Sequence, residues 1–357
     1  MHPLSRRRFL RASVGGFAAL AAGYAGYSAW PFQGSPSASN TNVEPITRTG
    51  HALGTTVSLT AIPNPNVSRQ RANTQVAAAL DAAFAELDQI ENVLSLYRPH
   101  SELCRLNAQG HLDQPHPYLM QVLRASLAMS QRTSGAFDVT VQPLWKAHAQ
   151  AQKNGGEPDA LAIANARQAV GYQRISIHKD RIAFIASDGP TNAPMSITFN
   201  GIAQGFAVDR VKAVLQAHSI TSALLDVGEL AAIGRKQDAQ SWQVGIQHPR
   251  EPDAYAALAK LDQRSLATSG DYATSFTPDR TSHHLIDPRT GQSPGELASV
   301  SIVAPTAMEA DALSTALFIL GYDKSMALID QSRNVDALFI FKDGRQAITP
   351  GFPQVQL

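Results

Sequence analysis

The chain of 357 residues contains little cysteine, few charged residues and almost no net charge. The single cysteine, Cys104, excludes an internal disulfide and a thiolate metal cluster. Charged residues make up 17% of the chain and their formal sum is +1, so composition provides no general attraction to nucleic acid or anionic lipid. We therefore expect no nucleic-acid partner. Hydrophobic residues make up 44%, which predicts a globular chain with a large core.

The N-terminus predicts export. The basic run Arg6–Arg8 is followed by an Ala/Gly-rich stretch from Ala12 to Trp30 that contains no charge. This pattern is typical of a twin-arginine signal, with a membrane anchor as the alternative. We expect residues 1–30 to be that signal or anchor, residues 31–47 a Pro/Ser-rich linker and residues 48–357 one large domain. The predicted location is the periplasm, with attachment to the inner membrane if the signal is not cleaved.

The hydrophobic pattern predicts interleaved helices and strands. Apolar residues at steps of three and four predict helices over 76–94, 117–129, 158–170, 205–218, 309–320 and 324–329. Alternation and β-branched runs predict strands over 55–61, 174–177, 182–185, 195–199, 222–227, 242–247 and 300–304, and a hairpin over 337–348. Because no regular βαβ repeat appears, the predicted fold class is α+β.

Two glycines, Gly201 and Gly205, separate a predicted strand from a predicted helix. Glycine lets the backbone approach a ligand closely, and a helix N-terminus offers unpaired N–H groups to a phosphate. The alternative is a tight strand-to-helix turn without a ligand.

Asp311 and Thr315 stand at i and i+4 of a predicted helix, so their side chains share one face with Ser314 beside them. A carboxylate and a hydroxyl are hard oxygen ligands, suited to Mg²⁺ that holds a phosphate. A carboxylate that merely stabilises the start of the helix is the alternative. That alternative leaves Ser314 and Thr315 unexplained in an otherwise apolar helix.

His283 and His284 precede the segment Leu-Ile-Asp-Pro-Arg-Thr-Gly. Because the histidine proton is exchanged near neutral pH, the pair is a candidate general base; a solvated loop is the alternative. The chain contains neither a Gly-x-Ser-x-Gly elbow nor a Gly-x-Gly-x-x-Gly dinucleotide fingerprint.

Seven motifs, in order along the chain, resemble the ApbE family of FAD:protein FMN transferases. They are Leu53–Thr56, Ser95–Leu103, Ser134–Thr140, Gly201–Asp209, Ala267–Tyr272, His283–Gly291 and Ala310–Ala316. The resemblance implies an ApbE-like, T-fold-like arrangement of mixed sheets with packed helices. It also implies Mg²⁺-dependent transfer of FMN from FAD to a Thr or Ser hydroxyl of a target flavoprotein, with release of AMP.

The same resemblance implies roles for single residues. Asp311, Thr315 and the backbone carbonyl of Gly201 would hold Mg²⁺, and His284 would take the proton of the acceptor hydroxyl. The implied FAD contacts are Leu53, Tyr97, Ala136, Phe137, Asp138, Thr198, Gln204 and Leu285. Three of them differ from the residues that are usual in the family: Leu53 replaces Met, Thr198 replaces Asp, and Gln204 replaces Lys or Glu.

The segment Leu224–Leu230 replaces the family's usual Asn-x-Gly-Gly-Asp. This variant and the wording Gln142-Pro143-Leu144-Trp145 resemble the branch associated with nitrous-oxide reductase maturation. The expected acceptor is an apo-flavoprotein with a periplasmic FMN-binding domain, such as a nitrous-oxide reductase regulator or an Rnf/Nqr-type subunit. Two alternatives stay open: an FAD pyrophosphatase that releases FMN and AMP, and a non-catalytic flavin carrier or chaperone.

Overall fold

The computed structural model describes residues 43–186, 194–236, 239–261 and 263–355. The predicted signal or anchor and most of the predicted linker lie outside these ranges, and the last two linker residues, Ile46 and Thr47, already belong to the first strand. The α+β class is confirmed. Among the helices in the described ranges, none is long and apolar enough to cross a membrane.

The centre of the molecule is an antiparallel sheet of eight strands, in the order β1-β2-β6-β7-β10-β11-β12-β13. Its strands are β1 (Ile46–Ala52), β2 (Thr55–Ala61), β6 (Ala223–Asp226), β7 (Leu230–Ile233), β10 (Ser265–Gly270), β11 (Leu297–Ala304), β12 (Asp336–Phe341) and β13 (Gln346–Ile348). The predicted hairpin is confirmed as β12 and β13.

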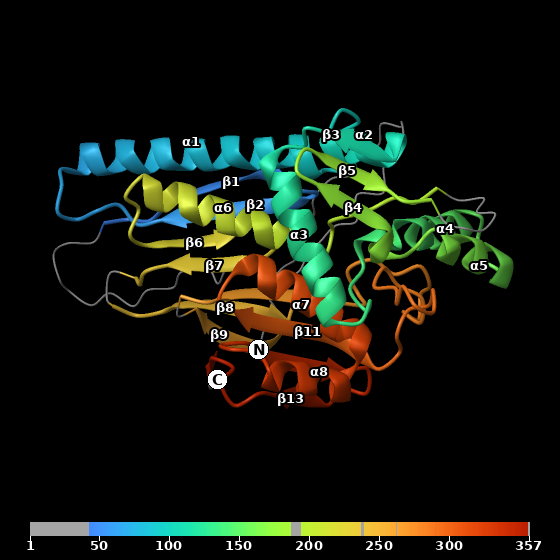
Figure 1. The fold of residues 1–357 in the computed structure, drawn as a ribbon. Coiled ribbons are helices and arrows are strands. Elements are labelled where there is room, and N and C mark those ends of the chain that lie inside the picture. The colour runs from blue at the N-terminus through green and yellow to red at the C-terminus, as the bar shows by residue number, and fades with distance from the viewer. Residues whose placement is uncertain (1–42, 187–193, 237–238, 262, 356–357) are drawn as a thin grey trace, which may run out of the picture.

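Both faces of this sheet are covered. Helices α1 (Arg69–Leu94), α6 (Ala203–Ala217) and α7 (Ala307–Leu320) lie along one face, as Figure 1 shows, and α3 (Pro117–Arg132) packs over them. A smaller sheet of β14 (Gln354–Val355), β9 (Tyr255–Leu261) and β8 (Trp242–Gln247) covers the other face. Successive residues of a strand therefore enter different cores: Leu225 faces the helices and Leu224 faces the small sheet.

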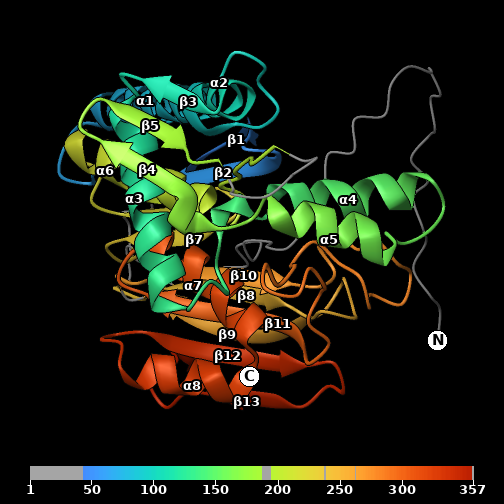
Figure 2. The ribbon, with the colours of Figure 1, turned by 45° about the vertical axis from the view of Figure 1, so that its right-hand side comes forward.

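A hairpin of two helices, α4 (Gln142–Lys153) and α5 (Ala160–Gln168), projects from one end of the molecule (Figures 1 and 2). A third sheet, β3-β5-β4, lies nearby and consists of β3 (His111–Asp113), β5 (Arg181–Phe184) and β4 (Ile175–His178). Leu144 and Ile163 of the helical hairpin pack against Phe276 and Ile286. The hairpin thereby supports the long irregular segment that follows β10. The remaining helices are α2 (Glu102–Gln109) and α8 (Tyr322–Asp330).

The predicted strand over 195–199 is wrong. This segment is extended, but its backbone bonds to a side chain instead of a neighbouring strand: the Asn107 amide accepts from the Ile197 N–H at 2.7 Å and donates to the Ile197 carbonyl at 2.9 Å. The next residue, Thr198, donates its N–H to the Val139 carbonyl at 2.8 Å. One side-chain amide can satisfy one residue of an extended chain but cannot extend a ladder.

Candidate active site

Each of the helices α6 and α7 provides a carboxylate that binds backbone N–H groups near the N-terminus of the other helix, an arrangement called here the carboxylate exchange. The carboxylate of Asp311 on α7 accepts the Gly205 N–H of α6 at 2.9 Å. In return, the carboxylate of Asp209 on α6 accepts the N–H groups of Ala307 and Met308 at the start of α7, at 2.9 and 3.0 Å. Amides in the first turn of a helix have no partner within the helix and carry the positive end of its dipole, so each carboxylate stabilises the other helix. This exchange fixes the position of Asp311.

The two glycines allow this approach. A Cβ atom on Gly205 would lie 2.2 Å from the carbonyl oxygen of Ala307, closer than any side chain can come. A Cβ atom on Gly201 would lie 2.9 Å from Thr315 Oγ1 and 3.4 Å from the Phe137 ring. Gly201, Thr315 and Phe137, predicted from separate motifs, are thus side by side. The glycines do more than form a strand-to-helix turn, because they let one helix and the preceding loop contact α7.

The hydroxyl group of Ser269 on β10 positions the hydroxyl groups of Ser314 and Thr315 on α7. Ser269 Oγ lies 2.8 Å from Ser314 Oγ and 3.2 Å from Thr315 Oγ1, and Ser314 donates to the Asp311 carbonyl at 2.9 Å. Ser269 and Ser314 are buried. The polar residues that interrupt the apolar helix α7 are therefore used to orient the predicted ligand Thr315.

Three buried carboxylates gather near this point: Asp311, Asp226 and Glu229. Burial raises the pKa of Asp311, and the charge of Asp209 acts in the same direction. Burial also raises the pKa of Asp226 to about 7. The pKa of Glu229 is raised well above its ordinary value by burial and then by the charge of Asp311. Among the described residues, no Lys or Arg forms an ion pair with any of the three, so no local counter-charge offsets the cost of ionising them.

This environment fits a hard divalent cation. The available donors are the Asp311 carboxylate, the Thr315 hydroxyl and the Gly201 carbonyl, all oxygens of the kind that Mg²⁺ prefers. Within the part of the chain that the structure describes, no three His, Cys, Asp or Glu side chains are arranged to hold a metal by themselves. A cation here would therefore depend on mixed protein ligands and on oxygens from the substrate.

His284 is oriented as a proton acceptor. Its Nδ1 lies 3.1 Å from the carbonyl oxygen of Thr274, and its backbone N–H donates to the same carbonyl at 3.0 Å. Because a carbonyl can only accept, Nδ1 carries the ring hydrogen and the lone pair of neutral His284 is on Nε2. Burial lowers the pKa of His284 to about 4, against the opposing effects of the Thr274 carbonyl and Asp271. The ring is therefore neutral near pH 7.

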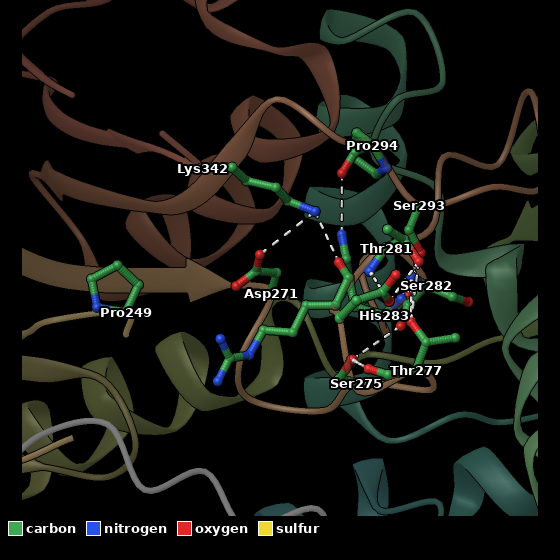
Figure 3. Close-up of polar contacts among 12 residues, drawn as sticks. Pro249, Asp271, Ser275, Thr277, Thr281, Ser282, His283, Ser293, Pro294 and Lys342 are labelled. Atoms are coloured by element: carbon green, nitrogen blue, oxygen red, sulfur yellow. Dashed lines mark hydrogen bonds and ion pairs between the residues drawn. The ribbon is translucent and has the colours of Figure 1, made fainter. Parts of the chain in front are cut away.

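His283 has a different position. It is completely buried, and its Nε2 lies 3.1 Å from the Pro294 carbonyl, as part of the network in Figure 3. Its ring packs edge-on against Phe318. Its backbone N–H donates to Ser293 Oγ at 2.9 Å. The first histidine of the pair anchors the loop, which leaves the second as the candidate base.

Two of the predicted FAD contacts are Leu53, which bonds to Glu91, and Tyr97, which precedes the arginine that pairs with the same carboxylate. Leu53 and Gly54 have positive φ angles of 53° and 76° and form the two-residue turn between β1 and β2. Leu53 donates its N–H to Glu91 at 3.0 Å, and the other oxygen of Glu91 pairs with Arg98. The neighbouring Tyr97 is 64% exposed, so its ring is available to a ligand.

Ala136, Phe137 and Asp138 follow α3 and are buried. The Asp138 carboxylate accepts the N–H and hydroxyl of Thr140 at 2.8 and 2.6 Å, and the Tyr172 N–H at 3.0 Å. Burial raises the pKa of Asp138, and these hydrogen bonds act in the opposite direction. Its carboxylate therefore shapes the loop that presents Phe137 to Gly201.

Gln204 and Leu285 are also buried, Leu285 in the main core. Gly228, with φ of 87°, faces the Gln204 amide so closely that a Cβ atom would lie 2.7 Å from Gln204 Nε2. Thr55 lies on the same side of Gly228. The unusual segment Leu224–Leu230 thus packs against Gln204, one of the three positions that differ from the residues usual in the family. Thr198, another of them, is buried, and its Oγ1 accepts the Asn200 N–H at 3.2 Å.

Comparison with known proteins identifies the family. The family model described as "ApbE family" matches residues 53–339. The chain belongs to the ApbE family. It is 34% identical over 307 residues to the FAD:protein FMN transferase of Treponema pallidum, which covers 80% of this chain and 83% of that protein. It is 30% identical over 283 residues to an FAD:protein FMN transferase of Klebsiella pneumoniae, across 76% of this chain and 79% of that protein.

Solved structures agree. The apo form of the flavinyl transferase ApbE from Pseudomonas stutzeri superposes with a TM-score of 0.74 at 29% identity, covering 88% of this chain and 98% of that one. The ApbE protein of Thermotoga maritima shows the same fold, with a TM-score of 0.73 at 24% identity over 86% of this chain and 97% of that one. The present ApbE-family chain is therefore an enzyme of the flavin transferase class.

Several residues that build this ApbE site had no role in the sequence analysis. Ser269, Asp209 and Glu229 are buried polar side chains whose partners come from other elements. The hydroxyl residues of β10, a wholly buried strand, are a local signal of this kind. Among the described residues, no hydrogen bond joins His284 or Tyr97 to Asp311 or Thr315. His284 is connected to Ser269 along the chain, because the loop that carries His284 begins two residues after Ser269.

Proposed function

We propose that this ApbE-family enzyme transfers FMN from FAD to a Thr or Ser hydroxyl of a target flavoprotein. The reaction depends on Mg²⁺, forms a phosphoester and releases AMP. The observation that carries the proposal is the close contact of α6 and its preceding loop with α7, which holds Asp311 at Gly205 and places Gly201 beside Thr315. Relatives named FAD:protein FMN transferase support the donor and the group transferred.

At the phosphate end, Asp311, Thr315 and the Gly201 carbonyl would hold Mg²⁺, which neutralises charge on the pyrophosphate. The Gly205 amide keeps the Asp311 carboxylate in one orientation, and Ser269 does the same for the Thr315 hydroxyl. The chain's overall charge is near neutral, so binding of an anionic dinucleotide depends on these local groups.

At the acceptor end, His284 takes the proton of the acceptor hydroxyl through Nε2. The acceptor oxygen then forms a bond to the phosphorus of the FMN half as the bond to AMP breaks. A neutral alcohol is a weak nucleophile, so a base within hydrogen-bond reach is required. A base that is already neutral near pH 7 meets that requirement.

The flavin end of FAD would contact Leu53 and the exposed ring of Tyr97, together with Ala136, Phe137 and Asp138. Thr198, Gln204 and Leu285 would complete that set. The support for this assignment is that the segment of Phe137 reaches Gly201, so one face of the site is shared between the flavin contacts and the metal ligands.

The sequence of residues 1–30 supports export to the periplasm by the twin-arginine route, and those residues lie outside the described ranges. This stretch holds four arginines and no acidic residue. The acceptor we propose is an apo-flavoprotein with a periplasmic FMN-binding domain, such as a nitrous-oxide reductase regulator or an Rnf/Nqr-type subunit.

The decisive test incubates the purified protein with FAD, Mg²⁺ and a Thr-bearing acceptor domain. We expect release of AMP and an acceptor whose flavin fluorescence survives denaturing electrophoresis. An acceptor domain in which Thr is replaced by Val is the matched control and should stay unlabelled. Release of AMP and free FMN at the same rate without acceptor would indicate an FAD pyrophosphatase. FAD that is bound but stays intact in the complete mixture would indicate a flavin carrier.

A further inference from the structure

The segment over 271–294, called here the histidine loop, is irregular in backbone yet held at several points. His148 of α4 is buried between two of them: its Nε2 lies 2.9 Å from the Gly291 carbonyl and its Nδ1 lies 3.2 Å from Ser282 Oγ. Phe276 stacks on the same imidazole. These contacts explain how a loop with few backbone pairs keeps one conformation.

A charged cluster holds the start of the same loop. Asp271 is completely buried, and Arg250 donates to both of its carboxylate oxygens at 2.7 and 2.8 Å. Lys342 lies 3.7 Å from the same carboxylate and donates to the Arg280 carbonyl in the middle of the loop at 2.8 Å. Figure 3 shows Lys342 between Asp271 and the stretch that carries Ser282 and His283.

Such a cluster is weak evidence for stability by itself. Desolvation of buried charges largely offsets their attraction, so an apolar cluster of the same size would hold the loop equally well. The electrostatic consequence is more specific. The negative charge of Asp271 favours the protonated form of both His283 and His284. Lys342 acts in the opposite direction on His283.

We propose that Asp271 is a positioning residue for His284. Its carboxylate fixes the start of the histidine loop and stabilises the imidazolium that forms when His284 takes the acceptor's proton. This inference rests on the proposed role of His284 as the base. The proton moves from the acceptor hydroxyl to His284 Nε2 and then leaves to solvent or to AMP.

The reason lies in the burial of the Nε2 atom of His284, a residue that as a whole is half-buried. Burial alone makes an imidazole a weak base, because its charged form loses hydration. A fixed carboxylate nearby restores part of that loss without moving. The charged group that acts on the His284 ring is Asp271, which is itself paired with Arg250 and Lys342. Lys342 and His284 both act on the neighbouring imidazole of His283. Tyr272 next to Asp271 is neutral, because burial raises the pKa of its phenol.

The test uses the full chain with Asp271→Asn, which removes the charge but keeps an oxygen that can accept from Arg250. Histidine labelled with ¹³C at the ring is titrated by NMR, with His284→Gln to assign the signal. We expect the midpoint of His284 to move to lower pH. We also expect kcat for transfer to fall by roughly 10-fold, because the base is weaker, while KM for FAD changes by less than about 2-fold.

The matched control is Lys342→Gln, which removes the opposite charge while its amide can still donate to the Arg280 carbonyl. Because Lys342 disfavours the protonated form of His283, the midpoint of His283 should move to higher pH in this variant. A loop role without electrostatics would move both midpoints the same way or neither, and that result would overturn the proposal. If Asp271→Asn fails to fold, the His283 midpoint of Lys342→Gln decides alone, and an unchanged or lower value overturns the proposal. If His284→Gln keeps full transfer, the base assignment fails, whereas the NMR midpoints still report whether Asp271 acts on this ring.

Discussion

Replacement of Gly205 by alanine tests the close approach of α6 and α7, because two effects of opposite sign compete. Inside a helix, alanine is more favourable than glycine by about 1 kcal/mol. At this position, however, the new Cβ would lie 2.2 Å from the Ala307 carbonyl oxygen and 2.8 Å from Asp311 Cβ. The first of these neighbours is backbone and cannot rotate away.

Relief of the contact requires the helices to separate by roughly 1 Å, the difference from an ordinary non-bonded distance. Overpacking of this kind costs about 1–3 kcal/mol. The separation also weakens the hydrogen bond from the Gly205 N–H to the buried Asp311 carboxylate, worth about 1.5–3 kcal/mol for a charged partner. We therefore expect a net loss of roughly 2–3 kcal/mol in the free energy of unfolding, despite the helix propensity of alanine.

The measurement is equilibrium unfolding in urea with a chelator present, so that metal binding does not contribute. Gly156→Ala is the matched control, because a Cβ there meets nothing within 4 Å. Its free energy of unfolding should change by less than about 0.5 kcal/mol. A Gly205→Ala protein as stable as the parent, or more stable, would refute the close packing of these helices and with it the position of Asp311.

Three further predictions concern the site. His284→Gln should lower the rate of FMN transfer by roughly 100-fold or more while FAD binding, followed by flavin fluorescence, is retained; a variant that no longer binds FAD would mark a structural histidine. Asp311→Asn can still accept the Gly205 N–H, so it should fold normally but lose Mg²⁺ affinity in calorimetric titration, and unchanged affinity would contradict the ligand assignment. Asp226 has a folded-state pKa of about 7 against 3.8 as its ordinary value, so the folded protein binds its proton more tightly than the unfolded chain. The stability from this carboxyl is complete below about pH 4 and is lost as pH rises towards 7, by up to about 1.4 kcal/mol per pH unit. The measurement is the free energy of unfolding in urea, without metal, between pH 4 and 8. The Asp226→Asn protein should lack this decline, and the same pH dependence in the variant and the parent would refute the prediction.

Much of the fold is predictable because the signal lies within single elements. The period of α1 and the alternation of β2 are properties of neighbouring side chains, and the Asp343-Gly344 turn determines the hairpin of β12 and β13. Strand β10 is different: all six residues are buried, and half of them are Ser or Thr, so neither alternation nor an apolar run identifies it. Its partners on β7, β11 and α7 come from distant parts of the chain.

The sequence by itself determined the fold class, the family and the residue types of the candidate site, because motif wording and hydrophobic period are local. It left open whether Gly201 and Gly205 formed only a turn, and it favoured His284 over His283 by resemblance alone. Only the tertiary structure decided these points. The glycines let α6 and its preceding loop contact α7, and one histidine is anchored against Phe318 while the other is held by the Thr274 carbonyl. The physical reason is that burial, hydrogen-bond partners and counter-charges are supplied by segments distant in sequence, so identical neighbouring residues acquire different chemistry only when the chain is folded.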